Sequence, residues 1–163
     1  MAVTFAEPTV FSTGRHVDVP RARALLDEKR AALEHSWQAY GENASLYEAM
    51  QCALAWDTVY DAQNDRIISP FSRLWSVNSG GYVLFCWDNY FAGFMASFGG
   101  EALAFSNLIE ITREQTPSGF IPNAAWGNGF KSLDRSQPPV GSAMALETYR
   151  RTGERWLLEP LVR

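Results

Sequence analysis

The sequence has 163 residues, 47% of them hydrophobic and 13% aromatic, and its formal net charge is −4. This length suits one ordinary domain with a hydrophobic core, and the composition excludes a disordered chain. A negative charge without a basic stripe argues against a nucleic-acid binder that relies on phosphate contacts. No apolar run reaches the roughly 20 residues of a membrane span, and the N-terminus has no signal-peptide pattern. We therefore expect a cytoplasmic protein with neither a nucleic-acid nor a membrane partner.

The cysteine and histidine residues suggest neither a metal site nor a catalytic centre. Cys52 and Cys86 are too few for a disulfide framework, and no Cys/His spacing is typical of zinc. Cys52 falls on a helical pattern, which predicts a small, buried hydrophobic residue. His16 and His35 are isolated from any nucleophile. We therefore expect no metal and no cofactor.

Apolar residues recur at helical spacing in six segments. The first helix begins after Asp18, which can cap it, has Pro20 in its first turn and ends at Gly41. A Ser-Leu-Tyr-Glu capping box at residues 45–48 opens the second. No segment shows convincing two-residue alternation, so the sequence predicts an all-α protein with an occasional short strand near residues 81–85. The later helices are expected at about residues 87–98, 101–115 and 140–153, with a sixth starting at residue 154.

The predicted connections between these helices alternate between long and short. Residues 61–85 and 116–138 are long connections, whereas short links join the third helix to the fourth and the fifth to the sixth. Short links make antiparallel neighbours, so we expect helical hairpins with both long connections at one end. Long ordered loops in a compact domain are usually functional, so that end should carry a site.

Both long connections combine aromatic rings with Arg, Asp, Asn and Gln side chains and with glycines. Flat apolar rings beside such polar groups suit a ligand with one C–H face and a rim of hydroxyls, as in a sugar. Plainer explanations also exist for each residue. Trp87 and Asp88 can be a core ring and a helix cap, Arg135 can pair with Asp134, and Trp126 can be a packing lid. The candidates for the sugar site are Arg73, Trp87, Asp88, Asn123, Trp126, Arg135 and Gln137.

Three motifs follow one another in this part of the chain: Trp-Asp-Asn-Tyr-Phe at residues 87–91, Ile-Pro-Asn at 121–123 and Arg-Ser-Gln-Pro-Pro at 135–139. Together they resemble the inverting α-glycosidases of the trehalase-like clan. The preceding Phe-Cys and the Ser-Arg-Leu-Trp at residues 72–75 make the sequence most similar to glycoside hydrolase family 63 and its relatives that cleave mannosylglycerate or glucosylglycerate. The resemblance covers residues 49–163.

The resemblance implies an (α/α)6 barrel of six inner and six outer helices with its active site at one end, which agrees with the pattern of connections. It also implies that Trp87 stacks on the sugar to be released and that Asp88 accepts hydrogen bonds from its hydroxyls. Asn123, Arg135 and Gln137 match positions that contact substrate or shape that pocket. Arg73 and Trp126 are placed there by loop position more than by a shared motif.

Inverting hydrolysis needs two carboxyl groups roughly 6.5–9.5 Å apart, one protonated and one ionised. In the families that the sequence resembles, the acid is an Asp in a Ser-Gly-x-Asp type motif downstream of Arg-Ser-Gln-Pro-Pro, and the base is a Glu further on. The Ser-Gly pairs at residues 79–80 and 118–119 have no Asp at the required spacing. We therefore identify no catalytic residue and predict that this chain alone is inactive as a glycosidase.

Two hypotheses follow. In the first, residues 1–18 are a lead-in or linker, and residues 19–163 form about half of an (α/α)6 barrel that is cut short at its C-terminus, with the remainder expected downstream. Twelve helices of average length, with their connections, need roughly 300 residues. The complete domain would hydrolyse an α-glucosidic or α-mannosidic bond with inversion, and this chain would supply its sugar subsite. The alternative is a non-catalytic helical protein that binds carbohydrate or has a structural role.

Overall fold

The computed structural model describes residues 5–71 and 81–159. Within these ranges the chain is mostly helical, with five α-helices and two small antiparallel sheets, so the helical prediction is confirmed although the chain also contains strands. The chain divides into two compact units, Met1–Glu48 and Ala49–Arg163. The second unit begins at the residue where the glycosidase resemblance begins.

The first unit is dominated by α1 (Val19–Gln38). Asp18 caps this helix as the sequence predicts, because its Oδ1 accepts a 2.8 Å hydrogen bond from the backbone N of Arg21. A short 3₁₀ turn (Gly41–Asn43) follows the helix. The second α-helix, α2 (Ala44–Asp57), begins in this unit and ends in the other. It starts before Ser45, so the predicted capping box does not open it. Cys52 on this helix is exposed, so the prediction that it is buried is wrong.

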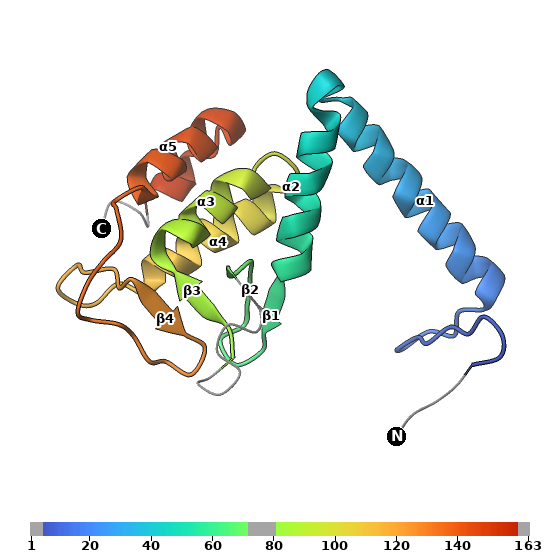
Figure 1. Ribbon diagram of the computed structural model, residues 1–163, viewed down its shortest axis with the longest axis horizontal. Helices are drawn as coiled ribbons and strands as arrows, with labels where there is room; N and C mark the ends of the chain where they lie inside the picture. Colours follow the sequence, from blue (N-terminus) through green and yellow to red (C-terminus); the bar gives the residue numbers. More distant parts are fainter. Residues whose placement is uncertain (1–4, 72–80, 160–163) are drawn as a thin grey trace. The chain divides into compact units, whose positions relative to one another are not determined.

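The second unit is built on three packed helices, α3 (Cys86–Ala96), α4 (Glu101–Arg113) and α5 (Gly141–Thr152) (Figure 1). Each lies within a few residues of its predicted position. Gly153 has a left-handed φ of 75° and ends α5, as its place in the sequence predicts. The segment predicted as a sixth helix instead forms a 3₁₀ turn, Arg155–Leu158.

The core of this unit lies where α3 and α4 pack closely. A Cβ added at Gly93 of α3 would lie 2.7 Å from Cγ of Leu108 on α4, so only glycine permits this approach. Such close packing requires a dry, well-filled interface. The buried hydrophobic residues of the main cluster are Ile68, Leu84, Cys86, Tyr90, Leu108, Ile111, Ala125 and Leu157.

The two sheets are both antiparallel pairs of three-residue strands. In the first, β1 (Val59–Asp61) pairs with β2 (Arg66–Ile68). In the second, β3 (Val83–Phe85) pairs with β4 (Ala124–Trp126), with Phe85 opposite Ala124. Because β3 belongs to the first long connection and β4 to the second, these connections are hydrogen-bonded to each other.

A buried ion network ties both long connections to α4. Its centre is Arg66 on β2, which is 8% exposed and donates from Nε to Asp61 (3.2 Å). Its Nη1 donates to Glu114 (2.8 Å) and its Nη2 to the hydroxyl of Tyr82 (2.8 Å). Lys131, from the second connection, pairs with Glu114 at 2.8 Å. The carboxylate of Glu114, the C-cap of α4, therefore binds cations from both connections.

Candidate functional site

The site begins where β3 runs directly into α3. Phe85 is extended (φ −98°, ψ 135°) and acts as the N-cap without a side-chain hydrogen bond of its own. Trp87 and Asp88 consequently fall in the first turn of the helix. Trp87 is 39% exposed, its ring lies 6.3 Å from that of Phe91, and Asp88 is half-buried. The sequence motif thus presents an indole ring and a carboxyl group side by side.

The second long connection caps this helix in place of a local side chain. The first backbone N–H groups of a helix have no partner within the helix. Here the Oε1 of Gln137 accepts from the backbone N of Trp87 (2.8 Å), and the carbonyl of Asn123 accepts from Cys86 N (3.1 Å). Residues of the second and third motifs therefore contact the start of the first.

Two further hydrogen bonds hold the second connection in this position. The backbone N of Asn123 donates to the carbonyl of Arg135 (3.0 Å), and the hydroxyl of Ser136 donates to the carbonyl of Ile121 (2.8 Å). These bonds fasten the segment around residue 122 to the segment before Gln137. Both bonds involve the residues directly before Gln137, whose carboxamide is held by its own bond to Trp87 N.

The electrostatics of Asp88 follow from this arrangement. Burial is the largest influence and raises the pKa of its carboxyl group. Hydrogen bonding from its own backbone and from the side chains of Trp87 and Gln137 favours the ionised form and offsets part of that effect. The pKa still lies above its ordinary value. Asp88 is thus a partly desolvated hydrogen-bond acceptor whose neighbours are a ring and a carboxamide.

Asp88 borders a pocket of about 320 Å³. Asp57 at the end of α2 lines the same pocket, and the rings of Phe71 and Phe91 form part of its wall. Ser69 and Met95 also line it. This volume is at the lower end of the range of roughly 300–1,000 Å³ found for small-molecule sites. The pocket therefore combines carboxylate acceptors with aromatic walls.

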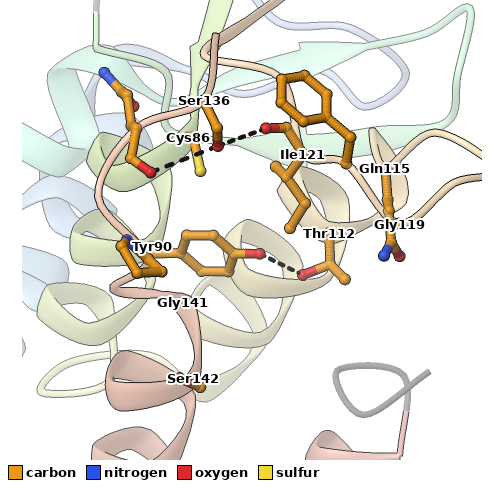
Figure 2. Close-up of a pocket in the computed structure, with 12 residues that line it drawn as sticks. Cys86, Tyr90, Thr112, Gln115, Gly119, Ile121, Ser136, Gly141 and Ser142 are labelled. Atoms are coloured by element: carbon orange, nitrogen blue, oxygen red, sulfur yellow. Dashed lines mark hydrogen bonds between the residues drawn. The ribbon is translucent and has the colours of Figure 1, made fainter.

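A second pocket, of about 330 Å³, borders Gln137 (Figure 2). The ring of Tyr90 extends along it toward Thr112, and the two side-chain oxygens lie 3.0 Å apart. The thiol of Cys86 also faces this pocket, and burial raises its pKa to about 11. The thiol is therefore protonated at neutral pH and is not a ready nucleophile.

The seven candidates thus differ in how they relate to the start of α3. Trp87, Asp88 and Gln137 come together through their side chains, and Asn123 joins them through its backbone. Arg135 contributes its carbonyl, while its guanidinium is exposed and pairs with Asp134. Trp126 lies on β4 opposite Val83 of β3. Its ring packs edge-on against that of Phe130, with the ring centroids 5.0 Å apart. Arg73 lies outside the described residues.

Sequence reasoning missed Asp57. Its immediate neighbours form an ordinary helix end, and the residues that share its pocket come from α2 itself, from the segment directly after β2 and from α3. No local pattern distinguishes such a residue from a surface acid. Only the proximity of α2 to the start of α3 identifies it.

Neither metal chemistry nor a membrane span is indicated in the parts of the chain that the structure describes. Residues 5–71 and 81–159 contain no group of three or more His, Cys, Asp or Glu side chains that could hold a metal ion. Over the same ranges, no helix has both the length and the apolar character needed to cross a bilayer. Compared with known proteins, the chain matches no family model, no curated protein and no solved structure. Its function is therefore inferred from its own motifs and from the geometry of this site.

Proposed function

We propose that residues 49–163 form the sugar-binding part of the catalytic domain of an inverting α-glycosidase, arranged as about half of an (α/α)6 barrel. The observation that carries this proposal is the convergence of Trp87, Asp88 and Gln137 from two distant motifs. An exposed indole ring, a carboxyl acceptor and an oriented carboxamide are the groups that a pyranose ring requires. The helical hairpin of α3 and α4 is compatible with such a barrel.

Each of these groups has a distinct role in binding an α-glucoside or α-mannoside. Trp87 offers a flat apolar surface to the C–H face of the sugar. Asp88 accepts hydrogen bonds from its hydroxyl groups, which restore the hydration that the carboxylate loses on burial. Gln137 binds the backbone of Trp87 through Oε1 and also interacts with Asp88. It therefore fixes the relative position of ring and acceptor.

The hydrolytic step itself needs a general acid and a general base that we do not identify among these 163 residues. Asp88 cannot perform both roles, because the acid and the base act from opposite sides of the bond. We therefore expect no turnover of α-glucosides or α-mannosides by this chain alone. In the complete enzyme, downstream residues would complete the barrel and supply both groups.

Substitution of Trp87 tests the proposed sugar site. In Trp87→Ala, saturable binding of methyl α-D-glucopyranoside or methyl α-D-mannopyranoside, followed by NMR titration, should be lost because the stacking surface is removed. Trp56→Ala is the matched control, since it removes a 71% exposed indole ring from α2 rather than from the start of α3. Equal affinity in wild type and Trp87→Ala would contradict the proposal.

The missing acid and base favour a second function, that of a non-catalytic helical carbohydrate-binding or structural protein. The two functions differ in what the gene encodes after codon 163. A glycosidase predicts an in-frame continuation with an Asp and then a Glu in the family's motifs, whereas a natural stop codon there favours the non-catalytic protein. Turnover of a nitrophenyl α-glucoside by the present chain would contradict our prediction of inactivity.

A further inference from the structure

Asp57 is a carboxylate without a partner at the end of a helix. It is the last residue of α2, it is half-buried, and no described residue forms a hydrogen bond or an ion pair with its side chain. The last turn of α2 contains no basic residue. Because the C-terminus of a helix carries partial negative charge, a carboxylate is unfavourable at this position. The folded chain gains no stability from an acid at this position. A ligand that donates hydrogen bonds would gain an acceptor from it.

The pocket that contains Asp57 also contains Asp88 of the proposed sugar site. Among the lining residues that the structure describes there is no Lys, Arg or His side chain. Ionised carboxylates are acceptors only, and each can accept more than one hydrogen bond. The pocket is therefore suited to a ligand that donates hydrogen bonds.

Apolar groups complete the wall between these two acids. The rings of Phe71 and Phe91 are 55% and 39% exposed, and the side chains of Leu54 and Met95 lie beside them in the pocket. Aromatic and aliphatic groups suit the C–H face of a sugar ring. With a volume of about 320 Å³, the pocket is at the small end of ligand sites, which favours a single ring.

A hard metal cation fits this pocket poorly. Calcium takes six to eight oxygen ligands, and magnesium takes six. The pocket offers two carboxylates, and the residues the structure describes contain no group of three metal-ligating side chains. A neutral donor-rich ligand matches the two acids and the apolar wall together.

We propose that Asp57 is a second hydroxyl acceptor of the sugar site, so that one hexopyranose ring in this pocket donates hydrogen bonds to both Asp57 and Asp88. This inference rests on the proposed sugar-binding function and adds a residue and a pocket to it. Asp57 comes from α2 and Asp88 from α3, so the two acids approach the ring from different elements. Asp57 thereby contributes to the choice among sugars that differ in one hydroxyl group.

The test compares Asp57→Asn with wild type by NMR titration of the full chain with methyl α-D-glucopyranoside and methyl α-D-mannopyranoside. Asparagine keeps the size of the side chain but removes its charge, so the affinity for the better sugar should fall at least about tenfold, which is about 1.4 kcal/mol. Asp65→Asn is the matched control, because Asp65 does not line this pocket, and its affinity should equal that of wild type. A cooperative urea unfolding curve, with a midpoint no lower than that of wild type, verifies that Asp57→Asn remains folded.

A series of monodeoxy glucosides identifies the contact. Removal of the hydroxyl that binds Asp57 should weaken binding to wild type about tenfold but change binding to Asp57→Asn little, because the partner is already absent. Sugar binding that depends on Trp87 but is unchanged in Asp57→Asn would overturn this inference and leave the proposed function intact. If wild type binds neither sugar, the proposed function fails and the inference fails with it.

Discussion

Asp88 shows how a single residue of a binding site can lower the stability of the folded chain. Its carboxyl group is partly buried, its raised pKa records the cost of ionising it there, and hydrogen bonding from Trp87 and Gln137 repays only part of that cost. Binding residues often reduce stability because they are arranged for a ligand rather than for the folded chain alone. Trp87 shows the same conflict, since a large indole ring remains 39% exposed at the start of α3.

This conflict predicts that Asp88→Asn is more stable than wild type at pH 7. Because the pKa of Asp88 is higher in the folded chain than in the unfolded chain, its contribution becomes increasingly unfavourable as the pH rises through the interval between those two values. The stability gain should therefore be present at pH 7 and shrink as the pH falls toward the ordinary Asp pKa of about 3.9. Urea unfolding of both proteins at several pH values measures this difference.

The control for this experiment is Asp134→Asn, which removes an exposed carboxylate from a surface ion pair. Such pairs contribute about 0–1 kcal/mol. A stability difference between Asp88→Asn and wild type that does not vary with pH would contradict the prediction.

At the scale of elements, polar contacts act together with hydrophobic packing to determine where the long connections lie. The β3–β4 ladder joins the connections to each other, and the Arg66 network joins both to α4. Burial alone would raise the pKa of Asp61, but hydrogen bonds from Tyr82, Asn64 and Arg66 hold it well below its ordinary value. The ionised network is therefore the stable form at neutral pH.

Arg66→Met should destabilise the protein by about 3–5 kcal/mol, because it leaves the carboxylates of Asp61 and Glu114 buried without their shared cation. Urea unfolding with linear extrapolation gives this value. Arg150→Met is the matched control, since its exposed pair with Glu147 should contribute less than about 1 kcal/mol. A similar decrease in the free energy of unfolding in both variants would show that the buried network stabilises the protein no more than an exposed ion pair does.

At the scale of the whole molecule, many large hydrophobic side chains of the described residues are exposed. Fifteen large hydrophobic side chains are exposed among the described residues, and they include Trp56, Trp87 and Trp156. Large exposed apolar patches on soluble proteins mark surfaces that bind something else. Half of a barrel would have such a surface where the other half packs, so this exposure is consistent with the proposed domain.

The isolated chain should accordingly self-associate and bind an apolar fluorescent dye under native conditions. Sedimentation at increasing protein concentration should show a rising average mass, and dye fluorescence should exceed that of a compact protein of equal size. A chain that remains monomeric at high concentration and does not enhance dye fluorescence would contradict this prediction.

Local patterns were sufficient for much of the secondary structure. Asp18 caps α1 and Gly153 ends α5 through interactions within a few residues, so the sequence alone predicts both. The strands β1, β2 and β4 were missed because three residues are too few to show alternation. The capping box at Ser45 was wrong because a 3₁₀ turn before it continues directly into α2.

Length and composition predict one domain with its own core. The described structure instead divides into two compact units and has many exposed apolar side chains. By itself, the sequence determined the helices and singled out Trp87, Asp88 and Gln137, because periodicity, caps and motifs are local properties. Only the tertiary structure decided which of these side chains meet, and only it added Asp57 to the pocket of Asp88. The physical reason is that a pocket is formed by residues distant in the chain, whose proximity depends on packing rather than on neighbouring sequence.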